Sequence, residues 1–283
     1  LGGGVIGCEF ASVWKSFGAE VTIVEALPHL VPAEDESSSK LLERAFRKRG
    51  INFEIGVKFA SAEVTNDNVT VSLENGKQIT ADVLLVAVGR GPVSNDLGYE
   101  NVGIAMDRGY VLVDEKCRTN IPGIFAVGDL IPTLQLAHVG FGEGILVAEE
   151  IAGLNPRPIN YAGVPRVTYS EPEVASVGLT TAQAKAQGHE VVELNYDLAG
   201  NGKAQILRTA GSIKLVSAKD GPVLGVHMVG SRVGELLAEA QLIFNWEAEA
   251  IDVASLIHAH PTLSEAVGEA HLALAGKPLH AHG

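Results

Sequence analysis

Cysteine is scarce in this sequence of 283 residues, which contains only Cys8 and Cys117. These two positions lie too far apart to form a short redox or metal-binding motif, and so few cysteines in a chain of this length indicate a reducing compartment. We therefore expect a cytoplasmic protein, or one of an organelle matrix if the source is eukaryotic.

Positive charge and long hydrophobic runs are also scarce. The chain has 21 Lys and Arg against 34 Asp and Glu, which gives a net charge of −13. Such a chain is repelled by nucleic-acid phosphates and anionic lipids, and the short basic run in residues 44–49 is typical of an exposed helix end. The apolar run at residues 83–88 is too short to cross a bilayer, and no signal peptide is visible. These absences predict neither a nucleic-acid nor a membrane partner.

Enough apolar residues remain for a globular protein, since 46% of the residues are hydrophobic and 19% are charged. A chain of this length has room for about two domains. Its first residues, Gly2-Gly3-Gly4-Val5-Ile6-Gly7, form a G-x-G-x-x-G motif, which normally follows a buried strand of about five residues. Only Leu1 precedes the motif and no initiator Met is present. We expect the carboxyl-terminal part of a longer chain, cut inside the first strand.

The residues after the motif predict the rest of a dinucleotide-binding unit. A helical pattern ends at Gly18, residues 20–24 form a buried strand, and Glu25 follows that strand, 18 residues beyond Gly7. A carboxylate at this place accepts hydrogen bonds from an adenosine ribose. It also repels a 2′-phosphate, and residues 26–30 supply no arginine to bind one, so NAD is favoured over NADP.

The same unit continues with a predicted helix over residues 36–49 and a strand over 51–55. Residues 69–73 and 78–88 are typical of a hairpin that returns to the centre of the sheet. Gly89 follows this last strand, where a glycine leaves backbone exposed at the ligand crevice of an open α/β sheet or simply ends the strand in a turn.

A second predicted strand, residues 124–127, ends in a glycine and Asp129, and a helix over residues 136–152 follows. The carboxylate can bind sugar hydroxyls, and the helix start can bind a phosphate. An aspartate in a plain turn is the alternative.

His260 and Glu265 lie at the start of the last predicted helix. A carboxylate that accepts one ring N–H fixes the tautomer and raises the basicity of the other nitrogen. Thr262-Leu263-Ser264-Glu265 also fits a capping box, in which the glutamate would only bind backbone amides. A metal site at His258 and His260 is disfavoured, because no zinc-like spacing is present.

Five motifs together resemble the flavoprotein disulfide reductases, and within them the dihydrolipoyl dehydrogenase family. They are the glycine motif with Glu25, Ile124-Phe125-Ala126-Val127-Gly128-Asp129, Leu136-Ala137-His138, the segment from Thr168 to Gly178, and His260-Pro261-Thr262-Leu263-Ser264-Glu265. The resemblance spans nearly the whole chain in order. A glutathione-type reductase would have arginines beside the second strand, and a mercuric-type reductase would have a terminal cysteine pair. This chain ends instead with His280 and His282, which we expect to be solvated.

The resemblance implies a fold class and a division into domains. It implies an α/β NAD-binding domain over residues 1–91, the carboxyl-terminal portion of an FAD-binding domain over 92–156, and an α+β interface domain over 157–283 that forms a homodimer. In the last domain we expect strands at residues 166–169, 173–177, 191–196, 212–216 and 223–229, and helices from Thr180, at 233–245, at 250–256 and after Glu265.

The resemblance also assigns residues. The NAD site would include Gly2, Gly3, Gly4, Val5, Ile6, Gly7, Cys8, Glu9, Glu25, Val57 and Gly89. The FAD contacts would include Asp129, Gln135, Leu136, Ala137 and His138. His260 would be the catalytic acid/base, Glu265 would orient it, and Pro261 would be a candidate for a cis bond. No metal is implied.

The implied activity is the oxidation of dihydrolipoamide to lipoamide, with electrons passing through a disulfide and FAD to NAD. The partner would be a lipoyl-bearing acyltransferase or lipoyl protein of a 2-oxo-acid dehydrogenase complex. The 283 residues contain no Cys-x4-Cys, so we expect them to be inactive alone. A non-catalytic NAD-binding and dimerisation module, or another disulfide reductase of the family, remains the alternative.

Overall fold

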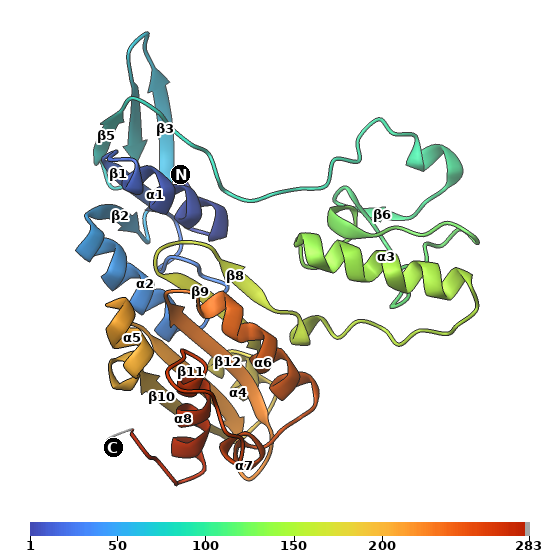
Figure 1. Ribbon diagram of the computed structural model, residues 1–283. Coiled ribbons are helices and arrows are strands. Elements are labelled where there is room, and N and C mark those ends of the chain that lie inside the picture. The colour runs from blue at the N-terminus through green and yellow to red at the C-terminus, as the bar shows by residue number, and fades with distance from the viewer. Residues whose placement is uncertain (281–283) are drawn as a thin grey trace. The chain divides into compact units, whose positions relative to one another are not determined.

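The computed structural model describes residues 1–280 of the chain, which divide into two compact units (Figure 1). Unit 1 combines Leu1–Gly89 with the chain from Pro165 onward, and unit 2 is Arg90–Val164. Among these residues no helix is both long and apolar enough to cross a membrane.

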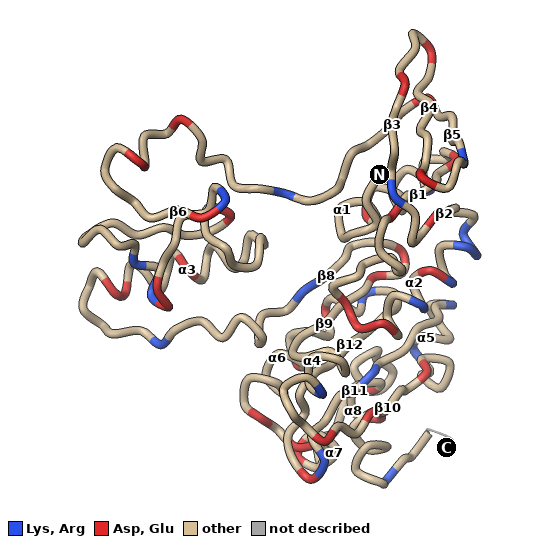
Figure 2. The backbone as a smooth tube through the Cα atoms, turned by 180° about the vertical axis from the view of Figure 1, so that it is seen from behind, with Lys and Arg blue, Asp and Glu red and all other residues tan. Residues whose placement is uncertain are grey.

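The first part of unit 1 contains α1 (Val5–Ser16), β1 (Val21–Glu25), α2 (Glu36–Arg49) and β2 (Ile51–Ile55). The two strands pair in parallel, as in a βαβ unit. Helix α2 agrees with its prediction, because the Asp35 side chain caps its start and Gly50, with φ of 74°, ends it. Basic residues gather near the last turn of α2, where they complement the helix dipole (Figure 2).

An antiparallel sheet of β3 (Phe59–Val64), β4 (Val69–Leu73) and β5 (Gln78–Ala81) follows. The predicted strand over residues 78–88 is wrong beyond Ala81, because residues 83–88 are irregular and three of their valines are exposed. A strand needs a paired strand along its length, whereas residues 83–88 are paired only with Leu1. Leu1 donates its amino group to Leu85 O at 2.7 Å and accepts Ala87 N at 2.7 Å.

The second part of unit 1 is a five-stranded antiparallel sheet in the order β10-β11-β12-β9-β8. Its strands are β8 (Arg166–Thr168), β9 (Glu173–Gly178), β10 (Val191–Asp197), β11 (Ser212–Ala218) and β12 (Val223–Gly230). These agree with the five predicted strands to within two residues. Every residue of β12 is buried, so this strand forms the centre of the core.

Helices pack against this sheet. They are α4 (Thr181–Ala186), α5 (Gly202–Leu207), α6 (Val233–Asn245), α7 (Ala250–Ala254) and α8 (Glu265–Leu274), with a short 3-10 turn at Leu198–Gly200. Another 3-10 turn, Tyr161–Gly163, belongs to unit 2. Helix α6 contacts β9 and β12, and α8 contacts β10 and β11 (Figure 1). Helix α6 contributes Leu237, Ala240 and Ile243 to the core, where all three are buried. Helix α5 was not predicted.

A buried ion pair between Lys214 and Asp35 joins the two parts of unit 1, and Glu193 of the neighbouring strand β10 also binds Lys214. Lys214 of β11 lies 2.9 Å from the Asp35 carboxylate and 2.8 Å from the Glu193 carboxylate. Burial would by itself raise the pKa of Asp35, but hydrogen bonds from Ser37 and Lys214 hold it well below its ordinary value. Val174 and Val229 of the sheet also pack into the core beneath α1 and α2.

Unit 2 contains the 3-10 turns η1 (Tyr99–Val102) and η2 (Gly128–Leu130), the short strands β6 (Met106–Asp107) and β7 (Tyr110–Val111), and helix α3 (Ala137–Ile151). The helix agrees with its prediction. The predicted buried strand at residues 124–127 is wrong, because its pairing is an isolated bridge between Arg118 and Phe125 and only Ala126 is buried. A short apolar run does not form a strand without a longer neighbour.

Candidate active site

The glycine motif forms a tight loop at the start of α1. Gly2 has φ of 105°, and a Cβ there would lie 2.2 Å from Ala87 O. A Cβ on Gly7 would lie 1.9 Å from Gly2 O, so glycine is required at both positions. Gly4 faces open space and is the N-cap of α1, whose first turn has neither a side-chain cap nor an acidic residue. The first amides of α1 are thus arranged to receive an anion.

Glu25 lies beside this loop at the end of β1. Its Oε2 accepts the Gly3 amide at 2.6 Å and its Oε1 accepts the Leu27 amide at 2.7 Å. Each carboxylate oxygen has a further lone pair, so the side chain can still accept a hydroxyl. The amide of Val57 donates to the backbone oxygen of Glu25 at 3.3 Å, and Gly89 has φ of 128° with open space around its Cβ position. The structure therefore brings the loop, the acid and Val57 together.

Two further predicted residues of α1 have structural contacts. The Cys8 thiol is buried and lies 3.3 Å from Gly3 O. Burial raises its pKa to about 12, which makes it unreactive at neutral pH. The Glu9 carboxylate accepts the Tyr169 amide at 2.8 Å and so ties α1 to the second part of unit 1.

Unit 2 contains the second set of predicted site residues, which begins with Asp129. Asp129 is exposed in η2, and the residue before it is fixed by Glu143 of α3, whose buried carboxylate accepts the Gly128 amide at 2.6 Å. The same carboxylate accepts the hydroxyls of Thr133 at 2.8 Å and Tyr161 at 2.9 Å. Burial, followed by the hydrogen bond to Glu143, raises the pKa of Tyr161 far above its ordinary value. Glu143 was not predicted from the sequence, although a lone acid on an apolar helix face is a usable signal.

The remaining predicted residues of unit 2 form the start of α3. Leu136 is the N-cap and Ala137 and His138 open the first turn, which has no side-chain cap and no acid. Gln135 precedes them, and its backbone oxygen accepts Arg90 Nη2 at 2.7 Å. This helix start is also open to an anion.

His260 and Glu265 form a hydrogen-bonded pair. His260 Nδ1 lies 2.8 Å from Glu265 Oε1, and Glu265 Oε2 accepts the Thr262 amide at 2.8 Å. Helix α8 begins at Glu265 itself, so the glutamate is not the third residue of a capping box, although it does bind one amide. The His260–Pro261 bond is cis, as predicted, and an unpredicted cis bond precedes Pro172.

The pair has the geometry of a general base. Burial by itself would raise the pKa of Glu265, but the bonds from Thr262 and His260 lower it, so the carboxylate is charged at neutral pH. A charged acceptor at Nδ1 leaves the lone pair on Nε2, the tautomer that takes up a proton. The His260 side chain is 76% exposed, whereas that of Glu265 is 23% exposed. Glu265 thus holds the ring at Nδ1, while the rest of the imidazole is open to solvent.

His280 is exposed, as predicted, with 63% of its side chain accessible, but it also binds one carboxylate. Its amide and its Nδ1 lie 2.9 and 3.0 Å from the carboxylate oxygens of Glu269, a buried residue of α8. A buried carboxylate needs donors, and the tail supplies them. His282 lies outside the described residues.

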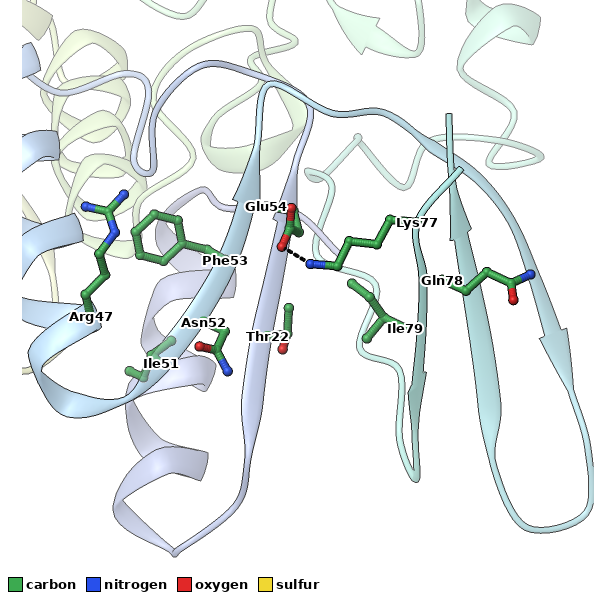
Figure 3. Close-up of a pocket in the computed structure, with 9 residues that line it drawn as sticks. All are labelled: Thr22, Arg47, Ile51, Asn52, Phe53, Glu54, Lys77, Gln78 and Ile79. Carbon is green, nitrogen blue, oxygen red and sulfur yellow. Dashed lines mark hydrogen bonds and ion pairs between the residues drawn. The ribbon is translucent and has the colours of Figure 1, made fainter. Parts of the chain in front are cut away.

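A separate pocket of about 510 Å³ lies between β2 and β5 (Figure 3). Its charged side chains are already paired, since Arg47 stacks 4.3 Å over the Phe53 ring and Lys77 forms an ion pair with Glu54. None of the predicted site residues lines it.

Comparisons with known proteins agree with these features. Residues 1–144 match the model of the pyridine nucleotide-disulphide oxidoreductases, and residues 164–271 match the dimerisation domain of that family. A dihydrolipoyl dehydrogenase of Bacillus subtilis is 42% identical over 99% of this chain and 60% of its own length. A mitochondrial dihydrolipoyl dehydrogenase of Schizosaccharomyces pombe is 44% identical over 99% of this chain and 56% of its own length.

Solved structures give the same result. LpdA from Mycobacterium tuberculosis superposes with a TM-score of 0.89 at 29% identity, covering 96% of this chain and 60% of its own. The flavoprotein disulfide reductase RclA from Escherichia coli gives a TM-score of 0.90 at 27% identity, covering 97% of this chain and 63% of its own. The chain spans about 60% of the length of these relatives. With over half of its residues matched by the family model, the chain belongs to the pyridine nucleotide-disulphide oxidoreductases.

Proposed function

We propose that this chain supplies the NAD site, part of the FAD site and the acid/base residue of a dihydrolipoyl dehydrogenase that works as a homodimer. Residues 1–91 are the NAD-binding domain, residues 92–156 complete an FAD-binding domain, and residues 157–283 form the interface domain. The observation that carries this proposal is the 2.8 Å bond between His260 and Glu265, beside an exposed imidazole face. The relatives named as dihydrolipoyl dehydrogenases support the substrate.

The residues present fit both cofactors. The uncapped first turn of α1 suits the NAD pyrophosphate, and the Glu25 carboxylate suits its ribose. In unit 2 Asp129 suits a hydroxyl-bearing chain, and the uncapped start of α3 suits a phosphate of FAD. We assign the remaining predicted residues to these two places, Gly2 to Glu9 with Val57 and Gly89 to the NAD site, and Gln135 to His138 to the FAD site. When bound, FAD and NAD supply two-electron acceptor chemistry.

His260 performs the proton transfer. A dithiol is mostly protonated at neutral pH, and its thiolate is the species that attacks a disulfide. The free Nε2 of His260 accepts the thiol proton, and Glu265 stabilises the resulting imidazolium through Nδ1–H. The lipoyl group comes from an acyltransferase or lipoyl protein of a 2-oxo-acid dehydrogenase complex, in the cytoplasm or an organelle matrix.

A non-catalytic NAD-binding and dimerisation module is the second candidate. It is favoured by the cysteines, because both Cys8 and Cys117 are buried and free. Burial raises the pKa of each, to about 12 and about 11, so neither can serve as the redox disulfide. On both readings the 283 residues alone do not oxidise dihydrolipoamide.

Replacing His260 in the full-length protein tests the proposal. We expect His260→Gln to lower NADH formation from dihydrolipoamide by about 10²- to 10⁴-fold, the usual contribution of a general base. His189→Gln is the matched control, because His189 is exposed and outside the site. A wild-type protein that forms no NADH from dihydrolipoamide would favour the non-catalytic module. An active wild type with an equally active His260→Gln variant would exclude His260 as the base.

A further inference from the structure

A second histidine–glutamate pair lies two residues before the first. His258 Nε2 is 2.8 Å from Glu239 Oε1 of α6. The His258 side chain is only 13% exposed, in contrast to His260. The two histidines of His258-Ala259-His260 thus face opposite ways, one into the protein and one outward.

Helix α8 closes the other side of the His258 ring. A Cβ on Gly268 would lie 2.5 Å from His258 Nδ1 and 2.7 Å from its Cε1, so the ring rests directly on the helix backbone. His258 is therefore held between α6 and α8. Both helices belong to the buried core of the sheet, which makes them rigid supports.

The segment between α7 and α8 carries both histidines of the two pairs. Leu256 and Ile257 are exposed. Beyond the histidine, Thr262 donates its hydroxyl to Ala259 O at 2.6 Å, and Asn201 donates its side-chain amide to Thr262 O at 3.1 Å. Thr262 thus fixes the chain after His260, and His258 fixes the chain before it.

We propose that the His258–Glu239 pair positions His260 for proton transfer. This proposal rests on the function proposed above. Neither residue needs to touch the substrate. Their bond fixes the backbone before His260, so that Nδ1 meets Glu265 and Nε2 points outward. Displacement of a catalytic group by about 1 Å costs on the order of 10²-fold in rate. The pair thus acts on the rate of proton transfer and not on substrate affinity.

Variants of the full-length protein test this role. We expect His258→Ala and Glu239→Ala each to lower kcat with dihydrolipoamide by roughly 10- to 100-fold, with KM changed by less than about 3-fold. The double variant should be no slower than either single variant, because both remove one interaction. His258→Gln should recover most of the rate, since its amide nitrogen can still reach Glu239. Glu235→Ala is the matched control, an exposed glutamate one turn earlier on α6.

Two readouts separate positioning from general damage. NADH oxidation by ferricyanide needs no proton removal from a dithiol, so we expect it to keep its wild-type rate in every variant. The second readout is the split between kcat and KM: a looser Glu265 bond slows proton removal from the bound dithiol, so kcat should fall in His258→Ala while KM changes by less than about 3-fold. Unchanged kcat in His258→Ala and Glu239→Ala, or an equal loss of ferricyanide activity, would overturn the positioning role alone. A wild type without dihydrolipoamide activity would overturn the proposed function with it.

Discussion

Replacing Glu265 by glutamine is the sharpest test of the candidate base, because the glutamate serves two donors. Its Oε1 faces His260 Nδ1 and its Oε2 accepts the Thr262 amide, both at 2.8 Å. A glutamine has one oxygen and one NH2. If the oxygen keeps Thr262, the NH2 faces Nδ1 and forces the ring proton onto Nε2, which removes the base. If the oxygen faces His260, two N–H groups meet at Thr262.

The expected loss follows from these two arrangements. A hydrogen bond to a charged group is worth about 1.5–3 kcal/mol, and about 1.4 kcal/mol corresponds to a tenfold change in rate. One lost bond therefore costs roughly 10- to 150-fold in kcat. Loss of the negative charge at Nδ1 also removes the group that stabilises the imidazolium, so the loss of kcat should persist at every pH at which the wild type is active.

The assay is stopped-flow NADH formation from dihydrolipoamide by the full-length protein across pH 5–9. Glu63→Gln, an exposed glutamate of β3, is the control for charge. An unchanged kcat together with an unchanged pH profile in Glu265→Gln would refute the orienting role. A matching loss of NADH–ferricyanide activity would show that the change had damaged the fold instead.

Three other changes have defined outcomes. Gly7→Ala should weaken NAD binding at least tenfold in an equilibrium titration while FAD content stays normal, because its Cβ would lie 1.9 Å from a loop carbonyl. Glu143→Gln should lower the thermal midpoint and FAD retention, since an amide cannot accept all three donors and an unpaired buried donor costs about 1–3 kcal/mol. Burial lowers the pKa of His227 and His271, so the folded state keeps both neutral. The free energy of unfolding should then fall below about pH 6.5 by up to about 1.4 kcal/mol per pH unit per histidine. Denaturant titrations at several pH values should show a weaker dependence of that free energy on pH in His271→Gln.

The parts of the fold that could be predicted from sequence have local causes. Helix α2 is specified by Asp35 at its start and Gly50 at its end, and the cis bond before Pro261 lies inside a recognisable motif. The requirement for glycine at position 7 is equally local, because its Cβ would meet Gly2 O, whereas the requirement at Gly2 comes from the distant Ala87. The apolar runs at residues 83–88 and 124–127 failed as strands because a strand depends on a distant neighbour.

The same distinction explains which site residues were missed. Glu143, Glu239 and Lys214 have charged groups whose partners come from other elements, 10 or more residues away along the chain. A charge on a helix looks the same in sequence whether it faces solvent or a buried donor, and only the fold decides between them. The motif residues were visible because they recur at fixed spacings, as Gly2 to Gly7 and His260 to Glu265 do. The residues that hold them in place carry no motif, so the supports of His260 on α6 are apparent only when the helix is packed beside its loop.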